Sequence, residues 1–210
     1  MTKILIIGAA GQIPRFLIPK LLANGHKLVL FARNASQRLN HLQQDNVEII
    51  DGDLKNRQQL MEAMKDVDIV YSNTLSNVEQ AKPIVETIED LKVNRLIVAS
   101  VLDIYGEVVG EFAKWNRMMV GNGTPERASA AEVVENSAIN YTILRLTWLY
   151  DQEGKKYEIT HKGDPFLGAQ VTRQAVAQLI TDIINNPKMY SYESIGVNEP
   201  NTNYDKPSFY

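Results

Sequence analysis

The sequence lacks cysteine altogether, and this absence excludes a disulfide framework, a thiolate metal site and a cysteine nucleophile. Histidine is scarce as well: the 210 residues include only 3, and no spacing of histidine or carboxylate residues resembles a metal site. No apolar run approaches the roughly 20 residues that a membrane-spanning helix needs. The apolar start, Ile4–Ile7, is too short for a secretory signal peptide. We therefore expect a cytoplasmic protein with no metal ion and no membrane partner.

Positive charge is also in short supply, because the formal net charge is −3. This balance argues against nucleic acid as a partner, since no global basic field would recruit it. The charges are unevenly distributed, however, and none of the 25 acidic residues precedes Asp45. Six cations lie in that acid-free segment: Lys3, Arg15, Lys20, Lys27, Arg33 and Arg38. Any attraction for phosphate must therefore be local to the N-terminal segment.

The first 145 residues alternate short apolar runs with amphipathic stretches, a pattern typical of βα units around a parallel sheet. The expected strands are Lys3–Ile7, Lys27–Phe31, Val47–Ile50, Val67–Tyr71, Arg95–Ala99 and Tyr141–Arg145. The expected helices are Ile13–Ala23, Arg57–Met64, Val78–Leu91 and Pro125–Asn136. Together they predict a doubly wound, mostly parallel α/β sheet in a single domain over residues 1–210.

The rhythm changes after Tyr150. Residues 151–168 are polar and turn-rich, Thr172–Asn185 has the pattern of an amphipathic helix, and Tyr190–Val197 that of a late strand. We expect residues 151–210 to form a small cap on the substrate side. The stretch Glu111–Met119 is interpreted as a long irregular insertion, either a lid over the substrate or a short surface helix without a ligand.

The first expected strand runs straight into the turn Gly8-Ala-Ala-Gly11, and a helix follows. Glycine permits a tight turn and lets backbone N–H groups approach a pyrophosphate, whose charge is favoured at a helix N-terminus. Pro14 replaces a third glycine and donates no N–H, so one donor is missing. The alternative is a turn that binds nothing. The residues predicted to hold the pyrophosphate are Gly8, Ala10, Gly11, Gln12 and Ile13.

Arg33 follows the second expected strand, at the place where an NAD-specific fold carries an acid for the ribose 2′-hydroxyl. A cation there pairs with a 2′-phosphate through a charge-assisted hydrogen bond. Arg38 and Arg15 are possible helpers, and the alternative is a solvated surface arginine. The sequence thus predicts NADP as the cofactor, with NAD as the lesser possibility.

Five motifs follow one another along the chain: Gly8-x-x-Gly11, Arg33, Asp51-Gly-Asp53-Leu54, Ser100 and Tyr141-Thr-Ile-Leu-Arg145. In this order they resemble the atypical short-chain dehydrogenase/reductase group, which has a Rossmann fold. Within that group the NmrA-like and flavin or biliverdin reductase-like branch matches best, over roughly residues 1–185.

The resemblance implies roles for several further residues. Asp53 would accept a hydrogen bond from the adenine amine, with Leu54 packed on the ring, although Asp53 could instead cap a helix beginning near Asn56. Ser100 would face the nicotinamide or the substrate carbonyl, and its alternative role is to cap a loop. The segment expected to pass near the ribose and pyrophosphate is Ser72, Asn73 and Thr74.

The chain departs from the family at the catalytic dyad, because Thr124 and Ala128 align with its tyrosine and lysine. No other Tyr-x-x-x-Lys follows Ser100. We therefore expect an NADP(H)-dependent oxidoreductase that acts on a small planar or conjugated acceptor without the dyad. A non-catalytic NADP(H) sensor is the alternative. Trp115 and Trp148 could stack on such an acceptor or simply pack in the core. The oligomeric state stays open.

Overall fold

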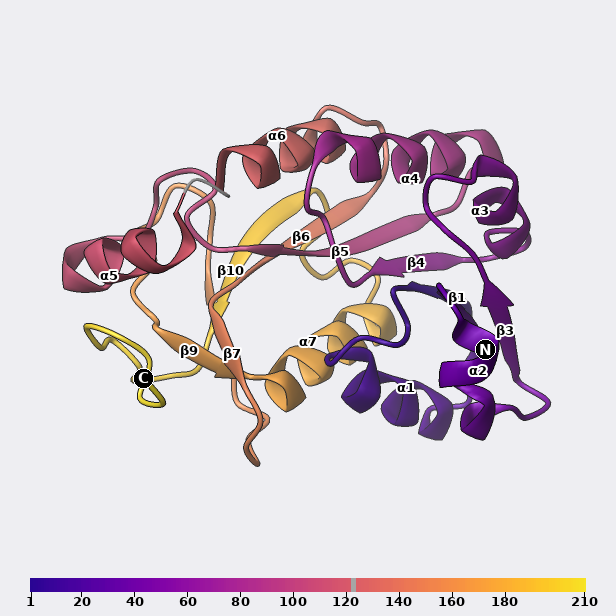
Figure 1. Ribbon diagram of the computed structural model, residues 1–210, viewed down its shortest axis with the longest axis horizontal. Coiled ribbons are helices and arrows are strands. Elements are labelled where there is room, and N and C mark those ends of the chain that lie inside the picture. The colour runs from indigo at the N-terminus through magenta and orange to yellow at the C-terminus, as the bar shows by residue number, and fades with distance from the viewer. Residues whose placement is uncertain (122–123) are drawn as a thin grey trace.

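A computed structural model describes residues 1–121 and 124–210. Its centre is an eight-stranded sheet in the order β3-β2-β1-β4-β5-β6-β10-β8 (Figure 1). All neighbouring pairs are parallel except β10 with β8. The doubly wound, mostly parallel α/β fold predicted from the sequence is thus confirmed. The strands are β1 (Lys3–Ile7), β2 (Lys27–Ala32), β3 (Val47–Asp51), β4 (Ile69–Ser72), β5 (Arg95–Val101), β6 (Tyr141–Leu146), β8 (Glu158–Thr160) and β10 (Glu193–Asn198).

Helices cover both faces of the sheet, as Figure 1 shows. Alternate residues of β1 supply both cores: Ile4 and Ile6 face one helical layer, while Leu5 and Ile7 face the other. The first layer contains α1 (Pro14–Ala23) and α7 (Arg173–Asn185), and the second contains α3 (Arg57–Ala63), α4 (Val78–Leu91) and α6 (Thr124–Glu135). Burial on both faces explains why these strands read as continuous apolar runs.

The topology creates a switch point between β1 and β4. From β1 the chain winds outward through β2 and β3, and it then returns to β4 on the other side of β1. Loops at the carboxyl ends of the two central strands therefore diverge, and this divergence opens a crevice for a ligand. A short helix, α2 (Ala35–Arg38), and a single 3-10 turn, η1 (Asn40–Leu42), follow β2.

The stretch interpreted as an irregular insertion is an 11-residue helix, α5 (Gly110–Val120). It has a buried face formed by Phe112, Ala113 and Asn116. The alternative interpretation of this stretch, a short surface helix, therefore holds for its secondary structure, and Phe112, Trp115 and Met119 recur along it at helical spacing. Figure 1 shows α5, β9 and the C-terminus on the same side of the molecule.

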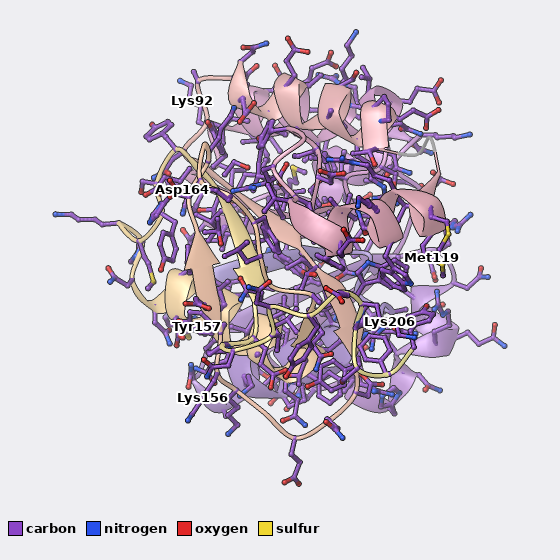
Figure 2. All side chains as sticks on the ribbon, turned by 90° about the vertical axis from the view of Figure 1, so that its left-hand side faces the viewer. Lys92, Met119, Lys156, Tyr157, Asp164 and Lys206 are labelled. Atoms are coloured by element: carbon purple, nitrogen blue, oxygen red, sulfur yellow. The ribbon has the colours of Figure 1, made fainter. Side chains whose placement is uncertain are left out.

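Residues after Tyr150 contribute to several parts of the fold. β8 and β10 extend the sheet, and α7 packs against α1. A separate two-stranded parallel sheet joins β7 (Trp148–Tyr150) to β9 (Gln170–Thr172). The tail that follows β10 lies on the same side as Met119 of α5, as the position of Lys206 shows (Figure 2). Within the described residues, no helix has the length and apolarity to cross a membrane.

Candidate functional site

The loop after β1 has the geometry that its glycines predict. Gly8 has φ +73°, a conformation that side chains disfavour, and its N–H donates to the Phe31 carbonyl oxygen at 2.9 Å. The Gly11 N–H donates to the Gly8 carbonyl oxygen at 2.9 Å, which closes the turn. A Cβ atom on Gly11 would collide with the side-chain amide of Asn73. Both positions therefore require glycine.

Unused donors gather where this turn meets α1. The N–H groups of Ala10, Gln12 and Ile13 have no acceptor within the described residues. Pro14 opens the helix, and neither a side-chain cap nor an acidic residue occupies the first turn of α1. The positive end of the helix and free N–H groups together suit a phosphate. This backbone cradle fits the pyrophosphate of a dinucleotide.

A cavity of about 550 Å³ lies beside the turn. Seven of the eleven residues predicted to bind the cofactor line it: Gly8, Ala10, Gly11, Arg33, Asp53, Leu54 and Thr74. The other four, Gln12, Ile13, Ser72 and Asn73, do not line it. The structure thus brings together residues that follow four different strands.

Cations lie at the end of this cavity that adjoins β2. Arg33 and Arg38 both line it, and Arg38 Nη2 donates to the Ala10 carbonyl oxygen at 3.1 Å. Asp51, at the end of β3, accepts from the Ser36 N–H at 3.1 Å, and hydrogen bonding from Ser36 lowers the pKa of this carboxyl. The carboxylate is therefore stabilised by the start of α2. Arg15 lies elsewhere, because its Nη2 pairs with Asp151 at 2.9 Å.

The loop after β3 places Asp53 against the cavity. Its Oδ1 accepts from the Lys55 N–H at 3.0 Å, and its own N–H donates to Gln59 Oε1 at 3.1 Å. The cap of α3 is Asn56, whose side chain accepts from the Gln59 N–H, so Asp53 does not have the capping role. Asp53 lines the cavity, and within the described residues only its Oδ1 accepts a hydrogen bond.

The loop after β4 is braced from within. Tyr71 donates to Asn73 Oδ1 at 2.9 Å, and the buried Ser72 hydroxyl donates to the Thr74 carbonyl oxygen at 2.8 Å. Burial raises the pKa of Tyr71, so this phenol stays a donor. Ser72 and Asn73 therefore shape the loop, while Thr74 contributes to the cavity wall.

The start of α4 also lines the cavity, and sequence reasoning missed it. Asn77, Glu79 and Gln80 belong to the wall, and Asn77 caps the helix by accepting from the Gln80 N–H at 3.0 Å. An Asn directly before an apolar-periodic segment is a recognised helix start. That signal could have placed this helix terminus at the carboxyl edge of the sheet, beside the cofactor loops.

Ser100 lies near the end of β5 and is buried, with its side-chain oxygen unpartnered within the described residues. The hydroxyl therefore does not cap a loop. Val101 and Leu102, which follow it, line a second cavity of about 570 Å³. The other described lining residues are Asn116, Val120, Thr124, Arg127, Leu146, Thr147, Trp148, Leu149, Arg173, Phe209 and Tyr210.

Aromatic rings gather at this second cavity. The ring centroid of Trp115 lies 4.9 Å from that of Trp148, and the Tyr210 ring lies 5.2 Å from each. Trp148 Nε1 donates to Asn116 Oδ1 at 2.9 Å. A flat apolar molecule would pack favourably against such rings. Thr124 lines the cavity, whereas Ala128 packs against the core beneath α6.

Buried charges hold the segment between β5 and α5. Arg145 and Glu107 form an ion pair at 2.6 Å with almost no exposed side-chain surface. The Tyr105 hydroxyl donates to Glu135 Oε1 at 2.7 Å and also lies 3.0 Å from Ser194 Oγ. Burial is the main reason that the pKa of Tyr105 is raised. Tyr105 is thus committed to a structural network outside the second cavity.

Comparison with known proteins gives a consistent result. A family described as NAD(P)H-binding matches residues 8–187. No curated protein matches the chain. A short-chain dehydrogenase/reductase from Veillonella parvula, solved in complex with NADP, is 33% identical with a TM-score of 0.95, and the match covers 99% of each chain.

Two further solved structures share the fold. A Rossmann-fold NAD(P)-binding family protein from Shigella flexneri is 36% identical with a TM-score of 0.82, over 100% of both chains. An anaerobillin reductase from Escherichia coli O157:H7 is 21% identical with a TM-score of 0.80, over 99% of this chain and 100% of that one. At this lower identity the likeness concerns the fold alone.

Proposed function

Because the chain belongs to the NAD(P)H-binding family, within the atypical short-chain dehydrogenase/reductase group, we propose that it is an NADP(H)-dependent oxidoreductase for a small planar or conjugated acceptor. The observation that carries the proposal is the pair of cavities at the carboxyl ends of the strands. One has a phosphate cradle and cations, and the other has aromatic walls. Ser100 lies on the strand whose end borders the second cavity.

The preference for NADP rests on Arg33 and Arg38. Both line the first cavity, and Lys55 adds a third cation to the same wall. Arg33 follows β2 directly, where it would meet a ribose 2′-phosphate in a bidentate contact. Asp51 at the end of β3 forms no ion pair with Arg33 within the described residues, and its carboxylate accepts from the Ser36 N–H. The NADP complex of the Veillonella parvula protein is consistent with this assignment.

The remaining cofactor contacts lie in this cavity and at the adjoining start of α1. The free N–H groups of Ala10, Gln12 and Ile13 would hold the pyrophosphate, and Gly8 and Gly11 would let it approach the backbone. Asp53 would accept the adenine amine beside Leu54. Ser72 and Asn73 would support Thr74 against the ribose side.

The bound cofactor supplies a hydride. This chain would then stabilise charge on the acceptor rather than deliver a proton through a tyrosine. The buried Ser100 hydroxyl, which has no partner within the described residues, would donate to a developing oxyanion, although Ser100 itself lines neither cavity. Thr124 and Ala128 cannot act as the Tyr-x-x-x-Lys dyad, so the proton that balances the hydride would come from water. An acceptor that delocalises its negative charge tolerates such a slow proton source.

We infer a single domain whose C-terminal segment completes the acceptor side. Arg173, Phe209 and Tyr210 come from residues 151–210 and line the second cavity together with Trp148, whose ring contacts that of Tyr210. A non-catalytic NADP(H) sensor is the second candidate, and the missing dyad favours it. In that case the second cavity would bind a signal molecule without turnover.

The test couples binding to turnover. Calorimetry with NADPH and NADH measures cofactor affinity, and NADPH consumption is then followed with quinones, flavins and simple aldehydes. We expect turnover with the conjugated acceptors and little with aldehydes, which require a general acid. Faster reduction of aldehydes than of quinones would contradict the proposed acceptor class. Tight NADPH binding without turnover of any acceptor would support the sensor instead.

A further inference from the structure

The orientation of the Asn116 side-chain amide is determined by Trp148. Its Oδ1 lies 2.9 Å from Trp148 Nε1. An indole N–H is only a donor, so the atom that faces it must be the amide oxygen, and the two N–H groups of Nδ2 must point elsewhere. The direction of the amide therefore follows from hydrogen-bonding chemistry. It would otherwise be uncertain for an asparagine.

The amide nitrogen of Asn116 finds no hydrogen-bond acceptor within the described part of the protein. Asn116 is fully buried, and its Nδ2 has no hydrogen-bond partner within residues 1–121 and 124–210. A buried donor without an acceptor is costly, and native proteins usually provide a partner. Asn116 is nevertheless one of the residues that line the second cavity. A ligand there could supply the missing acceptor.

The other described residues that line the cavity provide no carboxylate that could accept a hydrogen bond from Asn116 Nδ2. Its described lining residues include Arg127 and Arg173 but no Asp or Glu. Leu102, Leu146 and other apolar side chains form much of the wall. A ligand matched to this surface is flat and apolar, with an oxygen or nitrogen lone pair in the plane of its ring. Conjugated carbonyl compounds, such as quinones, have this chemistry.

We propose that Asn116 Nδ2 donates a hydrogen bond to a carbonyl oxygen of the acceptor, and that Trp148 is the positioning residue that keeps the amide in this orientation. The inference rests on the proposed function of the second cavity as the acceptor site. Tyr210 is half exposed and its ring contacts that of Trp148, so displacement of this ring would be the acceptor's route toward the buried amide. Hydride addition to a conjugated carbonyl compound places negative charge on this oxygen, where an N–H donor stabilises it until water protonates it.

The chain provides its own probe for binding at this site. Its 2 tryptophans are Trp115 and Trp148, which contact each other at the second cavity. Quenching of tryptophan fluorescence, corrected for ligand absorbance, therefore reports occupancy of this cavity. The matched ligands are 1,4-naphthoquinone and naphthalene, which share a fused ring frame and differ in the two carbonyl oxygens. The chain has no cysteine thiol to which the quinone could add.

Two substitutions isolate the donor. Asn116→Asp keeps an oxygen for the Trp148 N–H and removes the Nδ2 donors, while Asn116→Leu is an apolar side chain of similar volume. We expect each to weaken naphthoquinone binding by about tenfold, the size of one hydrogen bond to a buried group. Naphthalene binding should change by less than about twofold, because hydrophobic packing contributes most of its affinity. Calorimetric NADPH affinity and the thermal midpoint show whether each variant is folded. If Asn116→Asp is not folded, Asn116→Leu alone still tests the donor.

A third variant tests the positioning role. Trp148→Phe keeps an aromatic ring and frees the amide to rotate, and Trp115 still reports binding. We expect a smaller loss for naphthoquinone, about threefold, since a rotated amide would place its nitrogen correctly only part of the time. Both ligands lose some packing area with the indole, so the readout is the ratio of naphthoquinone to naphthalene affinity, which should fall about threefold.

The possible failures are distinguishable. If wild-type protein binds both ligands but Asn116→Leu leaves the preference for naphthoquinone unchanged, Asn116 is only a packing residue and this inference is wrong. An equal loss of affinity for both ligands in Asn116→Leu would likewise show that Asn116 is only a packing residue. If neither ligand binds while NADPH does, the second cavity is not a site for planar acceptors, and the proposed function falls together with the inference.

Discussion

The two cavities of this molecule are built in different ways. The wall of the cofactor cavity consists largely of loops that directly follow β1, β2, β3 and β4, and its main donors are backbone N–H groups and cations. The second cavity, which we propose as the acceptor cavity, draws side chains from α5, α6, β7, α7 and the tail after β10, and many of them are aromatic or aliphatic. Backbone conformation should therefore control binding of the cofactor, whereas side-chain pairs should control binding of the acceptor.

The largest effect is expected at Gly11. Gly11→Val should weaken NADPH binding by about a hundredfold or more, because a branched side chain would fill the approach to the helix N-terminus and collide with Asn73. Calorimetry measures this loss. Tryptophan quenching by naphthoquinone should be retained, since the acceptor cavity lies on other elements. Simultaneous loss of both ligands in a folded variant would break the distinction between the two cavities.

Gly8 provides a contrasting variant in the same turn. Gly8 has φ +73°, so Gly8→Val should strain the backbone and lower the free energy of unfolding by roughly 1–3 kcal/mol. Denaturant unfolding measures this change. A Gly8→Val protein as stable as wild type would mean that the turn adapts to a side chain.

The next effect concerns cofactor choice. Arg33→Ala should lower the ratio of NADPH to NADH affinity about ten- to a hundredfold, because a charge-assisted hydrogen bond contributes roughly 1.5–3 kcal/mol. The control is Arg15→Ala, since Arg15 pairs with Asp151. Calorimetry with both cofactors should show an unchanged ratio for the control. An unchanged ratio in Arg33→Ala would refute the assignment of the 2′-phosphate site.

Turnover should distinguish Ser100 from the tyrosines. Ser100→Ala should lower kcat for a quinone by more than about tenfold, if the free hydroxyl stabilises developing charge. The kcat of Tyr105→Phe should stay within about tenfold of the wild-type value, because the Tyr105 hydroxyl bonds Glu135 and Ser194. The kcat of Tyr141→Phe should stay within the same range. Steady-state kinetics with folded variants tests this order. A thousandfold loss in either tyrosine variant would identify a general acid.

The smallest effect is a pH dependence on the acceptor side. Burial, aided by Glu199, raises the pKa of Tyr150 to about 12, from 10 in the unfolded chain. A raised pKa means that the contribution to stability is present below pH 10 and is lost as pH rises toward 12. Tyr150→Phe should therefore make the free energy of unfolding fall less steeply above pH 10. Urea titrations at pH 8 and 11 provide the measurement, and an unchanged slope would refute the role of this hydroxyl.

Local sequence was sufficient for the cofactor half. The residues from Lys3 to Ile7 form β1 with the predicted bounds, and Val78–Leu91 is the predicted helix α4. Strand, glycine turn and helix are consecutive, so their geometry depends on neighbours in the chain. For the same reason the position of Arg33 after β2 could be predicted from the sequence. The helix α5 was left open between an irregular lid and a short surface helix, because a glycine stands at each end and its buried face contains Asn116 among apolar residues.

Only the tertiary structure decided how distant residues pair. Arg15 carries the same local charge as Arg33, yet it binds Asp151, which is 136 residues away, and it does not line the cofactor cavity. The Asn116 amide is oriented by Trp148 across 32 residues, and Tyr210 reaches the same cluster from the tail. No local pattern encodes such contacts, because they exist only after the sheet and helices have packed. The glycine turn before α1 was therefore predictable from the sequence, while the second cavity became visible only in the folded chain.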